Sequence, residues 1–134
     1  MPILDTIVLI DDNPADNFYH RIIINDANIA SDIIEFEAVT NALHHLIKDG
    51  NSERINMIFL DINMPLQDGF SFLENYSKIK PALDTKIVVV ILTNSLNQRE
   101  RRKAEQSSLV DNYLTKPLTA EDLEMLIAEH FLQS

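Results

Sequence analysis

The chain has 134 residues, of which 46% are hydrophobic and 24% are charged, and these values suit one soluble globular domain with its own core. It contains no cysteine, which excludes disulfide bonds, thiolate metal sites and cysteine nucleophiles. The formal net charge of −10 argues against a nucleic-acid surface, which needs clustered Lys and Arg. No apolar run is long enough to cross a membrane, and we find no targeting signal, so we expect a cytoplasmic protein with no membrane or nucleic-acid partner.

The first part of the chain predicts a strand followed by a helix. Residues 6–10 are an apolar run that ends in a polar residue, which is typical of a strand covered on both faces of a parallel sheet. Asn13 is a favourable N-cap, and Pro14 occupies the first helical position, where a missing N–H costs nothing. The side chains that this helix is expected to bury are Ala15, Phe18, Ile22 and Ile23.

The second unit begins with a half-polar strand. Apolar and acidic residues alternate at residues 34–38, which favours a position at the edge of a sheet. Thr40 can begin a helix that ends at Gly50. The inward side chains of this helix would be Leu43, Leu46 and Ile47. Residues 55–60 are almost wholly apolar and predict a second buried strand.

A third helix is expected to begin at Asp68 and to end before Pro81. Its inward side chains would be Phe72, Leu73, Tyr76 and Ile79. Residues 87–92 predict a third buried strand, and residues 97–106 predict a helix that is almost entirely polar.

The last unit repeats the pattern of the second. Residues 110–114 are interrupted by Asp111 and Asn112, which favours another edge strand. Thr119 begins a final helix. Its inward side chains would be Leu123, Leu126 and Ile127.

Strands and helices thus alternate along the chain without a linker or a repeat. This order predicts an α/β fold, a flavodoxin-like (βα)5 three-layer sandwich on a parallel five-stranded sheet with right-handed crossovers. The strand order 2-1-3-4-5 would place the two half-polar strands at the edges. We therefore expect a single domain over residues 1–134, with no output domain.

Polar residues follow four of the five predicted strands at their carboxyl ends. They are Asp11, Asp12, Asp61, Thr93 and Lys116. Because the carboxyl ends of parallel strands lie along one edge of the sheet, these side chains should converge on one pocket. Crowded carboxylates repel one another, and a hard divalent cation such as Mg²⁺, which takes oxygen ligands, would neutralise them.

A pocket of this kind suits the transfer of a phosphoryl group to a protein aspartate. An aspartate carboxylate is a nucleophile that can form an acyl phosphate. Lys116 would supply a positive charge for one phosphoryl oxygen, and Thr93 would supply a hydroxyl group for another. Together with the metal, these groups would neutralise the charge of the transferring group.

Four segments carry this set of residues in the order of a known family. They are Ile10-Asp11-Asp12, residues 60–65 with Asp68-Gly69 behind them, Leu92-Thr93, and Thr115-Lys116-Pro117. Together, on the matching alternation of strands and helices, they resemble the receiver domains of two-component response regulators. The resemblance covers essentially the whole chain.

The resemblance implies a role for each matching residue. Asp61 would be the phosphoacceptor. Asp11 and Asp12 would hold Mg²⁺, together with Asp61 and the backbone carbonyl of Asn63. Lys116 would bind the phosphoryl group, and its peptide bond to the following proline is often cis in this family.

The resemblance also implies a conformational switch and a set of partners. Thr93 would turn inward on phosphorylation, and Tyr113 would follow it from a solvent-facing to a buried rotamer. A histidine kinase or a histidine phosphotransfer protein would be the donor. A downstream protein would bind the face made by the fourth helix, the fifth strand and the fifth helix. The chain would be a monomer or a phosphorylation-dependent dimer.

Three further positions bear on the resemblance, one as a departure from the family and two through the lifetime of the phosphoryl group. Asn94 stands where the family often has a small residue, and it could narrow access to the site or hinder Tyr113. Asn63 and Ser95 occupy positions at which relatives tune the lifetime of the phosphoryl group.

Other functions remain as alternatives. A phosphatase with an aspartyl-phosphate intermediate, such as the haloacid-dehalogenase type, carries an acid two residues after the nucleophile, where this chain has Asn63. A nucleotide or flavin binder needs a phosphate-binding loop after the first strand, and residues 11–14 are instead anionic. A receiver-like protein that has lost phosphorylation would only bind partners.

The four histidines invite a metal or phosphohistidine site. His44 and His45 are neighbours on a predicted helix, so their side chains point about 100° apart and do not share a ligand face. We expect both of them, and also His20 and His130, to lie on solvated helix surfaces.

Overall fold

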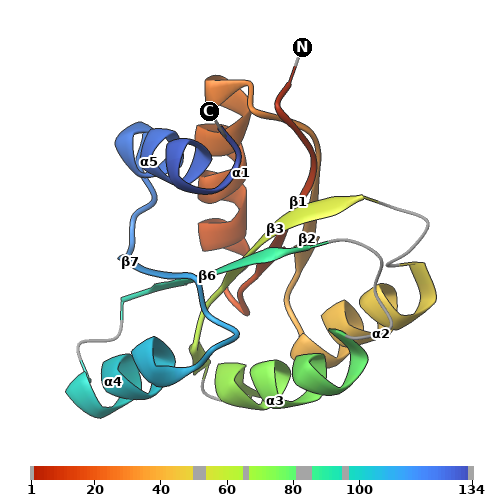
Figure 1. The fold of residues 1–134 in the computed structure, drawn as a ribbon, viewed down its shortest axis with the longest axis vertical. Coiled ribbons are helices and arrows are strands. Elements are labelled where there is room, and N and C mark those ends of the chain that lie inside the picture. The colour runs from red at the N-terminus through yellow and green to blue at the C-terminus, as the bar shows by residue number, and fades with distance from the viewer. Residues whose placement is uncertain (1, 50–53, 65–66, 81–85, 95–96, 133–134) are drawn as a thin grey trace.

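The computed structural model describes residues 2–49, 54–64, 67–80, 86–94 and 97–132 of the chain. The strands of its main sheet are β1 (Leu4–Ile10), β2 (Ala30–Phe36), β3 (Ile55–Leu60), β6 (Val88–Thr93) and β7 (Asn112–Thr115). The helices are α1 (Pro14–Ala27), α2 (Val39–Asp49), α3 (Gly69–Ile79), α4 (Gln98–Gln106) and α5 (Ala120–His130). The five strands are parallel and lie in the order β2-β1-β3-β6-β7, with α1 and α5 on one face of the sheet and α2, α3 and α4 on the other (Figure 1).

This architecture confirms the predicted fold class and the strand order 2-1-3-4-5 for the main sheet. The two strands predicted to be half-polar, β2 and β7, lie at its edges. β2 is longer than expected at its start, because it pairs with β1 along its whole length, from Leu4 opposite Ala30 to Ile10 opposite Phe36. The antiparallel pair β4 (Asn63–Met64) and β5 (Gln67–Asp68) was not predicted, since two-residue strands leave no periodicity in the sequence.

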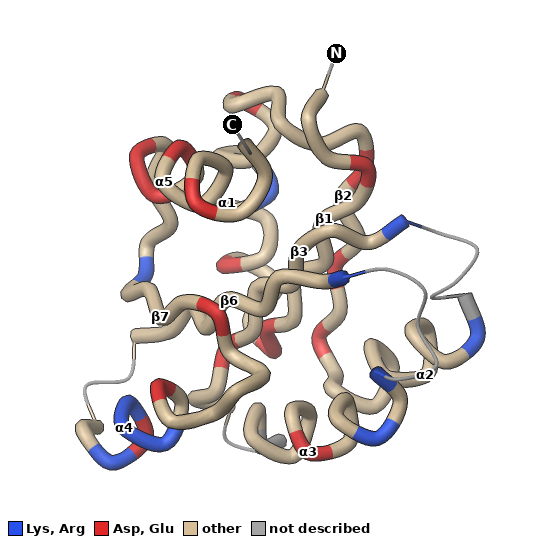
Figure 2. Tube along the Cα trace, viewed as in Figure 1, with Lys and Arg blue, Asp and Glu red and all other residues tan. Residues whose placement is uncertain are grey.

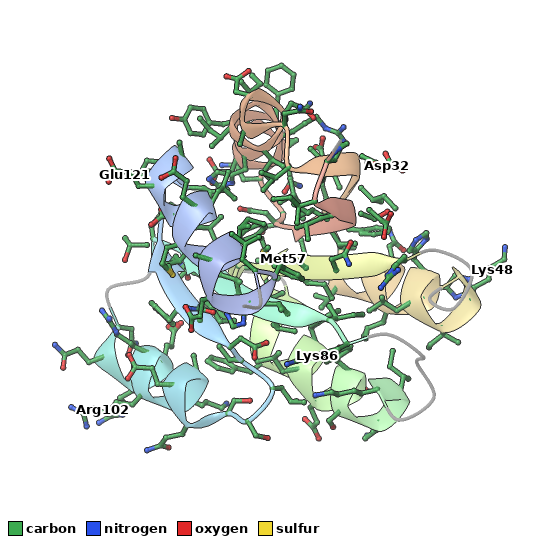
Figure 3. All side chains as sticks on the ribbon, turned by 45° about the horizontal axis from the view of Figure 1, so that its top comes forward. Asp32, Lys48, Met57, Lys86, Arg102 and Glu121 are labelled. Carbon is green, nitrogen blue, oxygen red and sulfur yellow. The ribbon has the colours of Figure 1, made fainter. Side chains whose placement is uncertain are left out.

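Each face of the sheet has its own apolar cluster. Phe72 of α3 belongs to the cluster beneath α2, α3 and α4, whereas Leu126 of α5 belongs to the cluster beneath α1 and α5. Figure 3 shows Met57 near the centre of the fold, while Arg102 and Glu121 point outward. The predicted inward side chains of α3 and α5 are buried, apart from the partly buried residue at the end of α3.

The prediction for the buried face of α1 was wrong. Phe18 and Ile22 are 62% and 41% exposed, and the residues that α1 buries are Asn17, His20 and Ile24. The amide group of Asn17 donates hydrogen bonds to the carbonyl oxygens of Asp11, at 3.0 Å, and of residue 36, at 3.4 Å. These bonds turn the polar side chain of Asn17 toward the sheet, so the larger apolar residues face outward. Ala15 is also exposed, and Ile23 is partly buried.

Several other side chains lie differently from the prediction. Ile47 is 65% exposed, and Thr40 lies within α2, which begins one residue earlier. His20 is buried, and His130 is half-buried, with its Nε2 2.6 Å from Asn112 Oδ1. His45 is half-buried with its ring centroid 5.4 Å from that of a neighbouring phenylalanine, so of the four histidines His44 alone is exposed as predicted.

Some predicted positions lie outside the described residues. These are Gly50, Pro65, Pro81 and Ser95. In the part of the chain that is described, no helix is both long enough and apolar enough to cross a membrane.

Candidate functional site

The predicted pocket lies where the strands of the main sheet reach their carboxyl ends. Asp11 follows β1, Asp61 follows β3 and Lys116 follows β7. The Asp61 N–H donates to the Ile10 carbonyl at 3.0 Å. The Lys116 N–H donates to the Thr93 carbonyl, also at 3.0 Å. These backbone bonds carry the parallel register past the strand ends, so side chains that are distant in the sequence meet.

The Lys116 ammonium group is at the centre of the site. Its Nζ donates hydrogen bonds to Asp11 Oδ2 at 2.6 Å, Asp16 Oδ2 at 2.7 Å and Asp61 Oδ2 at 3.0 Å. An ammonium group has three N–H donors, and these carboxylates use all of them. The Lys116 side chain is 8% exposed, those of Asp11 and Asp61 are each 6% exposed, and that of Asp16 is 33% exposed.

Asp16 is the member of this cluster that the sequence reasoning missed. It lies in the first turn of α1, where Asn13 is the N-cap and its side chain accepts from the backbone N–H of Asp16. An acidic residue in the first turn of a helix is usually explained by the favourable interaction with the helix dipole. The sequence signal that could have identified it is its position in the first turn of the helix that follows β1, at the same edge of the sheet as Lys116.

Backbone groups hold the second oxygen of each buried carboxylate. Asp11 Oδ1 accepts from the N–H of Asn13 at 3.0 Å, and Asp61 Oδ1 accepts from the N–H of Asn63 at 2.8 Å. Each carboxylate therefore has one oxygen fixed by the backbone and one bonded to Lys116. This arrangement orients both groups toward the same cation.

Gly69, the first residue of α3, allows that helix to pack against the backbone beside Asp61. A Cβ atom at this position would lie 2.7 Å from Ile62 Cα and 2.8 Å from the Asp61 carbonyl oxygen. Both neighbours are backbone atoms, so only glycine fits here without moving the chain that carries Asp61.

Burial and charge shift the pKa values of the groups in the site. Burial raises the pKa of the Asp11 carboxyl group, and the hydrogen bond from Lys116 only partly counteracts this effect. Burial alone would lower the pKa of Lys116, but its hydrogen bonds to Asp11, Asp16 and Asp61 outweigh burial and raise it. Lys116 is therefore charged at physiological pH. Burial, followed by the charge of Lys116, lowers the pKa of His20 behind the site.

The residues of the site fit a divalent metal ion with oxygen ligands. Asp11 and Asp61 already turn one oxygen each toward a shared cation, the ammonium group of Lys116. Asp12 is half-buried beside them, and its side chain has no hydrogen-bond partner among the described residues. No group of three or more His, Cys, Asp or Glu side chains in those residues is arranged to hold a metal alone. Mg²⁺, however, takes one or two carboxylates and completes its shell with water and phosphate oxygens.

The predicted switch residues lie on the two strands beyond β3. Thr93 is the last residue of β6, is fully buried, and pairs in register with Thr115 of β7. Tyr113 of β7 is half-buried, and its hydroxyl oxygen is buried without a hydrogen-bond partner in the described part of the chain, so the solvent-facing rotamer expected for the resting protein is not the one observed. The guanidinium carbon of Arg101 lies 5.1 Å from the centre of the Tyr113 ring.

A pocket of about 470 Å³ adjoins Tyr113 between α4 and β7. Its lining residues are Asn97, Gln98, Arg101, Arg102, Glu105, Tyr113 and Thr115. Figure 2 shows Lys and Arg gathered along α4, in contrast to the acidic residues of α5. Tyr113, the side chain that was predicted to move, thus lies beside the charged side chains of α4.

The remaining predicted positions lie around the mouth of the site. The side chains of Asn63 and Asn94 are exposed. The Lys116-Pro117 peptide bond is cis, the isomer that is often found in the family that the chain resembles.

Comparison with known proteins identifies one family, in both the sequence and the structure. Residues 7–128 match the family described as response regulator receiver domain. The chain is 33% identical to the response regulator Rcp1 of Synechocystis sp. over 125 residues, which are 90% of this chain and 82% of Rcp1. The crystal structure of a two-component response regulator from Cytophaga hutchinsonii matches with a TM-score of 0.84 at 31% identity, covering 93% of this chain and 95% of that one.

A more distant match is to a longer protein. The chain is 23% identical over 124 residues to the two-component response regulator ORR1 of Oryza sativa subsp. japonica, and the match covers 90% of this chain. The chain spans about half of the length of that rice protein, 52%.

Proposed function

This chain belongs to the response regulator receiver domain family of two-component systems, and from that premise we propose that it is a signalling switch that accepts a phosphoryl group on Asp61 in a Mg²⁺-dependent reaction. The observation that carries this proposal is the buried cation of Lys116, which is bonded to both Asp11 and Asp61. A nucleophilic carboxylate and a fixed positive charge lie in one pocket, which is what phosphoryl transfer needs.

The residues of the chain have separate roles in the transfer. An oxygen of the Asp61 carboxylate attacks phosphorus, the bond from phosphorus to the histidine nitrogen of the donor breaks, and that nitrogen keeps the electron pair. The N–H of Asn63 fixes the Asp61 carboxylate, and Lys116 donates to a phosphoryl oxygen. Asp11, Asp12, Asp61 and the backbone carbonyl of Asn63 would hold Mg²⁺, which, when bound, neutralises charge on the transferring group.

The switch would act through β6 and β7. The Thr93 hydroxyl group would turn to a phosphoryl oxygen, and Tyr113 would adjust its packing in response. The buried, unpartnered hydroxyl oxygen of Tyr113 supports this role, because a side chain without a hydrogen bond has little to lose by moving. The change would reach the surface at α4, β7 and α5, where a downstream protein would bind.

We propose a histidine kinase or a histidine phosphotransfer protein as the donor, since receiver domains work with these proteins. Residues 1–134 would act as a single receiver domain in the cytoplasm, as a monomer or as a dimer that forms on phosphorylation. Light scattering with and without beryllofluoride would distinguish these two states.

The test is phosphorylation by acetyl phosphate. With Mg²⁺, intact mass spectrometry should show one added phosphoryl group on the wild-type protein and none on Asp61→Asn. Asp32→Asn, which removes an exposed carboxylate of β2, is the matched control and should be labelled normally. Failure of the wild-type protein to form an acyl phosphate would leave the chain as a receiver-like binding protein. Continuous turnover of small phosphate esters would instead favour a phosphatase.

A further inference from the structure

We propose that Asp16 is a positioning residue that keeps Lys116 at the site throughout the phosphorylation cycle. The inference rests on the proposed function, because it concerns the lysine that would bind the phosphoryl group. The observation behind it is the 2.7 Å hydrogen bond from Lys116 Nζ to Asp16 Oδ2. Asp16 is a third carboxylate partner of Lys116, and it comes from a helix rather than from a strand end.

The first turn of α1 holds the Asp16 carboxylate in place. The Asp16 N–H donates to the backbone carbonyl of Asn13 at 3.1 Å and to its side-chain oxygen at 3.4 Å. The next residue, Asn17, is buried and bonded to the carbonyl oxygen of Asp11. Asp16 is therefore anchored to the loop after β1, and its carboxylate reaches Lys116 from a fixed position.

The three partners of Lys116 differ in what happens to them during the reaction. Asp61 loses its negative charge when one of its oxygens becomes bonded to phosphorus. Asp11 would turn its oxygen to the metal. Asp16 would be neither phosphorylated nor a metal ligand, so of the three it is the partner that keeps its full negative charge for Lys116.

A retained partner matters because lysine has a long side chain with considerable rotamer freedom. If Asp11 and Asp61 both released Lys116, its ammonium group could turn toward solvent instead of toward the phosphoryl group. With one N–H held by Asp16, the other two are directed into the pocket, where the phosphoryl oxygens arrive. Asp16 acts through Lys116 and does not itself need to touch the phosphoryl group.

The experiment is a double-mutant cycle with beryllofluoride as the phosphoryl mimic, at saturating Mg²⁺, followed by NMR titration. Asp16→Asn keeps the size of the side chain and removes its charge. We expect it to weaken beryllofluoride binding about tenfold, which corresponds to one charge-assisted hydrogen bond. In the Lys116→Met background the same substitution should have no effect. Asp16→Glu, which restores the charge on a longer side chain, should recover part of the affinity.

Asp26→Asn is the matched control, since Asp26 is an exposed residue near the other end of α1 and carries the same charge. It should bind beryllofluoride like the wild-type protein. The inference is overturned if Asp16→Asn also binds like the wild type, or if its defect persists in the Lys116→Met background. The second result would mean that Asp16 supports the fold or the charge balance and does not act through Lys116.

A second readout does not depend on phosphorylation. In the resting protein, the Nζ protons of Lys116 should exchange slowly with water, because all three are hydrogen-bonded in a buried site. Asp16→Asn should broaden or abolish their NMR signal, whereas Asp26→Asn should leave it unchanged. If the wild-type protein fails to bind beryllofluoride, the proposed function fails, yet an unchanged Lys116 signal in Asp16→Asn would still refute the positioning role by itself.

Discussion

Tyr113 and Lys116 are near neighbours at the end of the same edge strand, but they are bonded in opposite ways. All three N–H groups of Lys116 have carboxylate partners, and its side chain is buried. The hydroxyl oxygen of Tyr113 is also buried, but it has no partner among the described residues, and its ring contacts the exposed side chain of Arg101. We call Lys116 with its three carboxylate partners the fixed region, and Tyr113 with Arg101 the second region. The proposed chemistry would thus lie in the strongly bonded region, and the proposed response would lie where movement breaks few interactions.

The largest expected effect comes from removing the cation of the fixed region. Lys116→Met would leave three carboxylates close together with no positive partner, two of them buried. We expect a loss of about 3–5 kcal/mol in the free energy of unfolding, since removing one partner of a buried ion pair leaves uncompensated charge. Urea denaturation in EDTA measures this loss.

Adding Mg²⁺ should restore part of the stability of Lys116→Met, because the metal would neutralise the same carboxylates. Lys48→Met, on the surface of α2, is the control and should change stability little. Equal stability of Lys116→Met and the wild-type protein would show that the site is less tightly bonded than the distances indicate.

The second expected effect concerns the backbone next to Asp61. Gly69→Ala places a Cβ atom within 2.8 Å of backbone atoms of Asp61 and Ile62, which cannot move independently of the site. We expect a loss of about 1–3 kcal/mol, the usual range for overpacking, together with reduced labelling of Asp61 by acetyl phosphate. Glu74→Ala on the exposed side of α3 should affect neither quantity.

The residues of the fixed region that follow strands could be predicted from the sequence, whereas Asp16, which lies on a helix, could not. Asp11, Asp61 and Lys116 follow apolar or half-polar runs, and parallel topology alone brings such residues together. Asp16 has no such signal, because an acid in the first turn of a helix already has a local explanation.

The face of α1 was mispredicted for a related reason. Hydrophobicity ranks Phe18 and Ile22 above Asn17, yet Asn17 is the one buried. Its burial depends on hydrogen bonds to the carbonyl of Asp11, just after β1, and to that of Phe36 at the end of β2, and these two acceptors lie side by side only once β1 and β2 have paired.

The third prediction concerns the effect of burial and of the Lys116 charge on the pKa of His20, and therefore on the pH dependence of stability. The pKa of His20 is lowered in the folded protein by burial and then by the charge of Lys116. As the pH falls below about 6.5, the unfolded chain takes up a proton on this residue before the folded protein does, so stability should decrease. The slope can be at most about 1.4 kcal/mol per pH unit.

Urea denaturation between pH 7 and pH 5.5 measures this slope. His20→Gln should flatten it, whereas His44→Gln, on the exposed face of α2, should not. An unchanged slope in His20→Gln would show that this histidine does not set the pH dependence of stability.

The smallest expected effect lies in the second region. Tyr113→Phe removes a buried hydroxyl group that has no described partner, so it should leave stability unchanged or raise it by about 1 kcal/mol. Tyr19→Phe, on the exposed side of α1, should have no effect. Destabilisation by Tyr113→Phe would mean that the hydroxyl group makes a favourable interaction, and the contrast between the two regions would then be weaker. Thermal unfolding at one pH is sufficient for this comparison.

The separation of Asp11 and Lys116 by 105 residues also bears on the order in which the protein is made. During synthesis the three aspartates of the site leave the ribosome long before the lysine that binds them. Until β7 has been added to the edge of the sheet, these carboxylates repel one another without a cation of their own. A chain that stops before β7 therefore lacks the assembled pocket, and the proposed acceptor site would form only after β7 has been synthesised and has joined the sheet.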